Sequence, residues 1–266
     1  MPRQAIKPRV AIISLTSCEG CQFALLDLSQ DFIDLTSRID LVEMHLIEED
    51  PEPEAFDIVF VEGNPITEKN FTLLKKIRDK STLLITLGNC AALGGVWEMK
   101  NYLDKEKTLR YIYKFEKTVP NHDIKSIDNF VKIDYVVPGC PINAYEFLKI
   151  VYSLLLGKAP SIAENPVCYE CQYNSYECQL QQNPLQDRPA LPCLGPFIRG
   201  GCDAICLKSK MPCQGCRGLL KDADTAKMEK IYGDIINADE LNNILEIFGI
   251  RDDFEKKKLT YKNEKN

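Results

Sequence analysis

Residues 9–22, RVAIISLTSCEGCQ, join a short apolar run to a pair of cysteines. The apolar part, Arg9–Leu15, has the length and composition of a buried strand. The segment from Gln22 to about Ile39 follows at once, and its apolar residues recur near helical spacing, which predicts a helix. Because a strand followed by a helix is the repeating unit of an open α/β sheet, this stretch sets the expected fold class.

The same alternation continues to about residue 157. Four more apolar runs are predicted strands, namely Leu41–Ile47, Phe56–Val61, Thr82–Leu87 and Tyr135–Val137. Helices are predicted over Thr67–Lys80, with Thr67 as N-cap, over about Leu103–Lys117, and over Ile142–Leu156, which stops at Gly157. Alternating strands and helices predict a mostly parallel, doubly wound α/β sheet.

The composition changes after Gly157. From Ala159 to about Leu219 the chain is dense in Cys, Pro, Gly and Gln, and eight of the twelve cysteines fall there. This largely irregular segment cannot bury much apolar surface by itself, so metal centres are its expected organisers. Short helices are predicted over Thr225–Ile235 and Asp239–Phe248, followed by a charged, mobile tail over 251–266. The expected domains are therefore residues 1–157 and 158–266.

Charge, hydropathy and cysteine content bound the class of protein. With 33 Lys+Arg against 39 Asp+Glu, the net charge is −6, which argues against nucleic acid as the main partner. We find no run of 18 apolar residues and no export signal ahead of the first strand, so a cytoplasmic protein without membrane insertion is expected. Reducing compartments keep cysteines as thiols, and clustered thiols indicate metal binding or redox chemistry.

The first four cysteines follow the ends of predicted strands. Cys18 and Cys21 come after the first strand, Cys90 after the fourth and Cys140 after the fifth. Loops that leave the carboxyl ends of strands share one edge of such a sheet, so these thiols are expected to meet. An iron-sulfur cluster fits four thiolates; zinc remains an alternative, although zinc sites usually pair two short C-x-x-C knuckles.

The other eight cysteines lie within about fifty residues. Eight thiolates supply two 4Fe-4S clusters, and soft sulfur ligands select iron-sulfur, zinc or copper(I). Spacing does not dictate which four make each cluster, and two zinc ribbons stay open. Our sequential assignment places Cys168, Cys171, Cys178 and Cys193 in one set and Cys202, Cys206, Cys213 and Cys216 in the other.

Five motifs follow one another along the chain, namely CEGCQ at 18–22, VEGNP at 61–65, GNCAALGG at 88–95, PGCP at 138–141 and CLGPFIRGGC at 193–202. Together they resemble the small, electron-transferring subunit of nickel-iron hydrogenases. The resemblance implies a flavodoxin-like domain with a proximal 4Fe-4S cluster, and a Cys-rich iron-sulfur domain with a medial and a distal one. By position, it implies that the proximal ligands would be Cys18, Cys21, Cys90 and Cys140, the medial ones Cys202, Cys206, Cys213 and Cys216, and the distal ones Cys168, Cys171, Cys178 and Cys193.

Departures within that family narrow the resemblance. Membrane-linked members carry an export signal and often a distal His ligand, whereas Cys168 stands in that place here. The pattern is similar to the cytoplasmic group, which includes sulfhydrogenase or NAD(P)-linked delta subunits, F420-reducing gamma subunits and subunits that feed heterodisulfide reductase; LTSCEGCQF at 15–23 most resembles the first. The related 20 kDa subunit of respiratory complex I is disfavoured, because it has adjacent cysteines and one cluster.

The resemblance implies electron transfer without catalytic residues on this chain. Its partners would be a large subunit with the nickel-iron site and a further iron-sulfur or flavin redox subunit linked to NAD(P), F420 or heterodisulfide reductase. The alternative is a Cys-rich zinc-binding interaction module. Glu19 and Glu62 are candidates for a proton path, or ordinary carboxylates near a helix N-terminus. His45 and His122 are expected to be ordinary histidines.

Overall fold

The computed structural model describes residues 7–44, 47–49, 55–112, 123–182, 184 and 188–264, so His45 and His122 lie outside it. The chain forms two compact units. The first consists of Met1–Gly94 and Lys100–Ser161, and the second of Gly95–Met99 and Ile162–Asn266. Within the described ranges, every helix is too short or too polar to cross a bilayer.

The first unit is built on a six-stranded sheet of order β3-β2-β1-β4-β5-β6. All neighbouring strands are parallel except β3, which is antiparallel to β2 at the edge. Leaving β3 aside, the order is that of flavodoxin, which confirms the predicted fold class. The strands are β1 Arg9–Ser14, β2 Asp40–Met44, β3 Glu48–Glu49, β4 Phe56–Glu62, β5 Ser81–Leu87 and β6 Tyr135–Val137.

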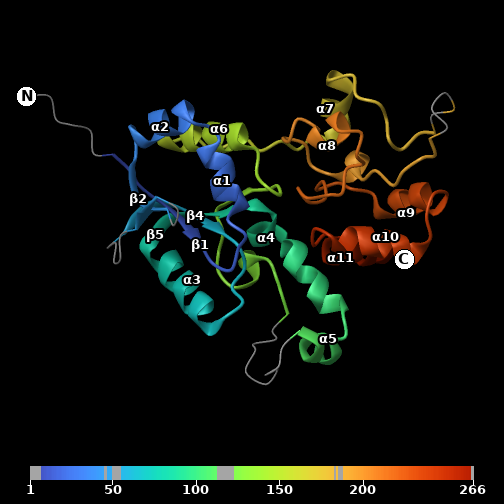
Figure 1. Ribbon diagram of the computed structural model, residues 1–266, viewed down its shortest axis with the longest axis horizontal. Helices are drawn as coiled ribbons and strands as arrows, with labels where there is room; N and C mark the ends of the chain where they lie inside the picture. Colours follow the sequence, from blue (N-terminus) through green and yellow to red (C-terminus); the bar gives the residue numbers. More distant parts are fainter. Residues whose placement is uncertain are drawn as a thin grey trace, which may run out of the picture. The chain divides into compact units, whose positions relative to one another are not determined.

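Alternate residues of the central strands face opposite layers of helices. Ala11 and Ile13 of β1 belong to one buried cluster with Leu74 and Ile77 of helix α3, Glu68–Lys80. On the other face, the ring of Phe60 in β4 packs against that of Phe147 in helix α6, with centroids 4.8 Å apart. Figure 1 shows α3 and α6 on opposite sides of the sheet. The side chains of the strand interiors are therefore apolar in both directions.

The predicted helices of this unit are mostly confirmed. Thr67 caps α3 through a capping box with Asn70. The single helix expected over 22–39 is wrong, since Ser29, at φ 52°, separates two helices. Apolar spacing continues across that break, so periodicity alone does not reveal it. The other helices of this unit are α1 Gly20–Leu26, α2 Gln30–Thr36, α4 Gly88–Leu93, α5 Lys105–Ile112 and α6 Ala144–Leu155, with the short 3₁₀ turn η3 Ile127–Asn129. The 3₁₀ helix η1 Gly95–Tyr102 contains residues of both units. Residues 113–117 of the helix predicted over about 103–117 lie outside the described ranges.

The second unit contains short helices and a core of its own. Its elements are α7 Val167–Tyr173, η5 Gly195–Phe197, α8 Ile205–Lys208, α9 Thr225–Gly233, α10 Ala238–Glu246 and α11 Arg251–Glu264. The mobile tail expected over 251–266 is wrong, because residues 251–264 form α11. Phe254 is buried, and Arg251 pairs with Glu246 and with Glu255. The buried Phe254 and these ion pairs hold a segment whose many charged residues, taken alone, predict exposure to solvent.

Candidate metal centres

The first four cysteines lie at the carboxyl edge of the sheet. Cys18 is in the loop after β1, Cys21 in the first turn of α1, Cys90 in α4 directly after β5, and Cys140 just after β6. Because β1, β4, β5 and β6 are consecutive parallel neighbours, the three loops leave the sheet at the same edge, with the end of β4 between the first and the second. Cys21 is buried, Cys90 half-buried, and Cys18 and Cys140 are exposed. All four therefore lie at one edge of the sheet, and their union in one centre stays a prediction.

The VEGNP motif ties two of these loops together. At the end of β4, Asn64 forms a β-bridge with Thr16 in the loop that leads to Cys18. The side-chain amide of Asn64 also donates a hydrogen bond to the carbonyl of Cys90, over 2.8 Å. Gly63 adopts φ +86°, and a Cβ there would lie 2.4 Å from the carbonyl oxygen of Thr16, so only glycine fits this turn.

Gly88, in the GNCAALGG motif, makes room for a sulfur atom. It has φ +84°, and a Cβ at this position would lie 2.4 Å from Sγ of Cys21. The N–H of the next residue, Asn89, donates to the carbonyl of Gly139 over 2.7 Å, which joins the α4 loop to the loop of Cys140. The backbone around Cys21 and Cys140 therefore leaves room for the Cys21 sulfur and holds the two loops together.

Burial and mutual repulsion disfavour ionisation of these thiols. Burial, together with the thiols of Cys140 and Cys18, raises the pKa of Cys90 to about 12. The pKa of Cys21 is also raised, chiefly by burial and then by Glu62. Thiolates are the form that binds metal, so such a set needs cationic charge among its members to ionise at neutral pH.

Glu62 is buried at the end of β4, and Glu19 is half-buried between the two cysteines of the first motif. Oε1 of Glu62 accepts the N–H of Cys21 over 3.1 Å, and Oε2 accepts the side-chain amide of Gln22 over 3.4 Å. Burial raises the pKa of Glu62. Glu62 therefore positions the first turn of α1, and the proton-path hypothesis for both carboxylates stays a prediction.

A second set of thiols lies in the second unit around α7. Cys168 and Cys171 are on α7, whereas Cys178 and Cys193 follow in loops. Burial and then the thiols of Cys193, Cys171 and Cys178 raise the pKa of Cys168 to about 12. These four side chains therefore lie within electrostatic reach of one another, and their assignment to one cluster stays a prediction.

The remaining four cysteines adjoin this set. The pKa of the buried Cys213 is raised by burial and by three other thiols, Cys193, Cys216 and Cys202. Cys206, on α8, contributes to the raised pKa of Cys193, which belongs to the other predicted set. The N–H of Cys213 donates to Sγ of Cys193, with nitrogen and sulfur 3.2 Å apart. The two sets thus touch, and the division between them stays a prediction.

Sequence analysis missed Glu170 and Arg217, which surround Cys202. Oε2 of Glu170 accepts the N–H of Ala204 over 3.0 Å and lies 3.8 Å from Sγ of Cys202. Arg217 is 1% exposed and donates from Nε to the carbonyl of Gly200 over 2.5 Å. The available signal was their place in the sequence, because Glu170 directly precedes Cys171 and Arg217 directly follows Cys216.

The residues present fit iron-sulfur clusters. All twelve cysteines lie in the described part of the chain, and none of them forms a disulfide. N–H groups directed at sulfur, as at Cys193, and glycine backbone against sulfur, as at Gly88, are features of cluster sites. Among the described residues, no three His, Cys, Asp or Glu side chains are grouped as ligands of a single metal ion would be.

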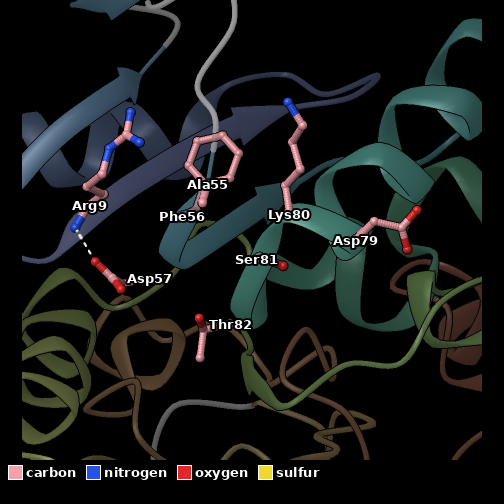
Figure 2. A pocket seen from close by; sticks show the side chains of 8 residues that line it. All are labelled: Arg9, Ala55, Phe56, Asp57, Asp79, Lys80, Ser81 and Thr82. Carbon is pink, nitrogen blue, oxygen red and sulfur yellow. Dashed lines mark hydrogen bonds between the residues drawn. The ribbon is translucent and has the colours of Figure 1, made fainter.

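A separate pocket of about 240 Å³ lies at the opposite edge of the sheet. Figure 2 shows its lining side chains at the amino ends of β1, β4 and β5, among them Arg9, Asp57 and Thr82. The N–H of Arg9 donates to Asp57 over 2.7 Å. Because the cysteines follow the carboxyl ends of the strands, this pocket is remote from the candidate centre of the unit.

Sequence comparison finds oxidoreductase and hydrogenase subunits among the relatives of this chain. Residues 18–154 match the family model described as "NADH ubiquinone oxidoreductase, 20 Kd subunit". Sulfhydrogenase 2 subunit delta of Pyrococcus furiosus is 31% identical over 90% of this chain and 98% of its own. An F420-non-reducing hydrogenase subunit of Methanocaldococcus jannaschii is 32% identical over 79% of this chain and 81% of its own.

A solved structure shares the fold. A chain of an NAD⁺-reducing [NiFe]-hydrogenase in its H2-reduced state matches with a TM-score of 0.53 and 25% identity. The match covers 94% of that chain but 58% of this one, so much of this chain extends beyond it. The 20 kDa family model spans only the first four cysteines, whereas the hydrogenase relatives span most of the chain. The chain therefore belongs to the NADH ubiquinone oxidoreductase 20 kDa subunit family and, within it, to the hydrogenase small subunits.

Proposed function

We propose that this chain carries electrons for a nickel-iron hydrogenase through three 4Fe-4S clusters. The proximal cluster would be held by Cys18, Cys21, Cys90 and Cys140, the medial one by Cys202, Cys206, Cys213 and Cys216, and the distal one by Cys168, Cys171, Cys178 and Cys193. The observation that carries the proposal is the meeting of three cysteine-bearing loops at the carboxyl edge of a flavodoxin-like sheet.

The chain's own residues would hold each cluster and set the polarity of its surroundings. When bound, a 4Fe-4S cluster takes up and releases one electron at a time, at a potential set by burial, charge and N–H bonds to sulfur. Cys21, Cys193 and Cys213 are buried, which keeps water from the sulfur ligands. The N–H of Cys213 stabilises negative charge on Sγ of Cys193, and Glu62 holds the turn that presents Cys21.

The catalytic centre would lie on a partner. All twelve cysteines are assigned to clusters in this proposal, which leaves no thiol pair to hold nickel and iron. Phe23 and Tyr145, 55% and 61% exposed, follow Cys21 and Cys140 closely in sequence. Exposed apolar side chains of this kind suit an interface with the large subunit.

A further redox subunit, with iron-sulfur or flavin cofactors, would accept or supply the electrons in the cytoplasm. The relatives are named as sulfhydrogenase, F420-non-reducing and NAD-reducing hydrogenase subunits, so the acceptor differs between them. The likeness over nearly the whole length of the sulfhydrogenase delta subunit favours that type. The likeness to hydrogenase subunits favours iron-sulfur clusters over the zinc-module alternative.

The proposal is tested by purifying the complex from its source without oxygen and measuring metals and sulfide. We expect about twelve iron and twelve sulfide per copy of this chain, as three 4Fe-4S clusters require. A nickel-containing large subunit should co-purify. A colourless protein with stoichiometric zinc would contradict the proposal, and the identity of the next subunit would name the acceptor.

A further inference from the structure

Glu170 belongs by sequence to one set of cysteines and by contact to another. It stands between Cys168 and Cys171 on α7, yet its carboxylate reaches the loop Gly200–Ala204. Oε1 accepts the N–H of Gly201, and Oε2 accepts the N–H of Ala204. Oε2 also lies 3.8 Å from Sγ of Cys202, at the centre of that loop.

Arg217 holds the same loop with the opposite charge. Its side chain is 1% exposed, and Nε donates to the carbonyl of Gly200 over 2.5 Å. A carboxylate therefore binds the N–H groups of the loop, and a guanidinium binds a carbonyl.

The loop is shaped to receive the carboxylate. A Cβ at Gly200 would lie 2.9 Å from Oε1 of Glu170, so a side chain at this position would displace it. Asp203 and Ala204 adopt φ 56° and 47°, which costs energy for residues other than glycine. The hydrogen bond from Ala204 to Glu170 stabilises this strained backbone. The paired glycines of the CLGPFIRGGC motif thus serve a contact that the motif itself does not contain.

We propose that Glu170 and Arg217 are positioning residues of opposite charge that fix the Cys202 thiolate and set the reduction potential of the cluster it ligates. Negative charge beside a cluster favours the oxidised state, which carries less negative charge, so Glu170 lowers the potential and Arg217 raises it. The inference rests on the proposed function, because it takes Cys202 as a cluster ligand. It also links α7, which bears two ligands of one cluster, to a ligand of the next.

The test is a redox titration of the intact, anaerobically purified complex, followed by electron paramagnetic resonance. In Glu170→Gln, the reduced-to-oxidised ratio of one cluster at a fixed potential should rise about tenfold, which is about 59 mV for a one-electron couple. Glu164→Gln removes an exposed carboxylate from the same unit and should leave every cluster unchanged. Equal behaviour of the two variants would overturn the inference.

Arg217→Gln keeps an N–H donor, removes the charge, and should lower the same ratio about tenfold. This variant decides the matter if Glu170→Gln does not assemble its clusters. Shifts of the same sign, an unmoved potential, or loss of the clusters in both variants would overturn the inference, since the pair would then build the site without tuning it. Absence of iron-sulfur signals from the wild-type complex would instead refute the proposed function.

Discussion

The backbone N–H of Cys213 points at the sulfur of Cys193, with a nitrogen–sulfur distance of 3.2 Å. The carbonyl of Cys193 in turn accepts the hydroxyl of Tyr232, over 2.6 Å. Cys193 is therefore held by its own sulfur and by its backbone, and one of these contacts comes from a cysteine that we assign to the neighbouring cluster. The two proposed cluster sites of the second unit are therefore linked at this residue.

Replacing Cys193 should damage more than one cluster. Cys193→Ser removes a distal ligand and the sulfur that receives the N–H of Cys213, so the iron content should fall below the two thirds that loss of one cluster in three leaves. Cys178→Ser is the matched control, because Cys178 is an exposed ligand of the same proposed set. Its iron content should stay at about two thirds. Iron and sulfide analysis of anaerobically purified complexes checks both values, and equal losses would contradict the coupling.

Cys140→Ser should abolish hydrogen turnover while it spares the fold. The residue is exposed and lies after the last strand, so its removal leaves the core of the sheet intact. Dye reduction with hydrogen measures turnover in the complex, and far-ultraviolet circular dichroism measures the fold. The control variant is Ser17→Ala, which changes the residue before Cys18 and should stay active. Full activity of Cys140→Ser would rule out its role as a proximal ligand.

Gly88→Ala should destabilise the first unit more than Gly157→Ala does. Both glycines have positive φ, at 84° and 68°, so both variants suffer backbone strain of about 1–2 kcal/mol. Only at Gly88 does the added Cβ meet a sulfur atom, 2.4 Å away, whereas nothing lies within 4 Å at Gly157. This clash should add about 1–3 kcal/mol. Urea unfolding of both variants measures the difference, and equal losses would disprove the clash.

Glu98 should make the stability of the second unit depend on pH. Burial, with Asp252 and Asp253 on α11 nearby and Lys256 partly compensating, raises its pKa from 4.5 to about 8. Between these values the unfolded carboxyl ionises while the folded one stays protonated. Stability therefore falls as pH rises through this window, by at most about 1.4 kcal/mol per pH unit, and levels off above it.

Glu98→Gln removes that dependence. The stability of this variant minus that of wild type should be larger at pH 8 than at pH 6, by about 1–3 kcal/mol, since the glutamine has no proton to lose. Urea unfolding at the two pH values provides the measurement. The exposed Glu164→Gln should show the same stability difference from wild type at both pH values, and a similar result for Glu98→Gln would contradict the effect.

Local patterns were sufficient for most of the first unit. The first strand, predicted over Arg9–Leu15 and observed over Arg9–Ser14, and the predicted N-cap at Thr67 depend on residues close in sequence, and both are confirmed. The break at Ser29 was not predicted, because apolar spacing carries no record of one residue with positive φ. Helix α11 was also missed. Its sequence is mostly charged, and the burial of Phe254, which holds the helix in place, depends on residues far away in the sequence.

The candidate sites also combine features that are visible in the local sequence with features that are not. The cysteines can be recognised by residue type and spacing, and the order of the strands explains why the loops of Cys18, Cys90 and Cys140 leave the same edge of the sheet. Glu170 is different, because its contact with Gly201 and Ala204 spans more than thirty positions. No local pattern contains such a contact. It depends on how the loops of the second unit fold back on α7.

The division of the chain into units has a consequence for dissection. The backbone leaves the first unit after Gly94, contributes Gly95–Met99 to the second, returns for Lys100–Ser161, and leaves again. A fragment that starts at Ile162 would therefore lack a buried part of its own unit, including Glu98. A single cut therefore cannot release the second unit whole, whereas a fragment of residues 1–161 keeps the first unit and carries Gly95–Met99 of the second with it.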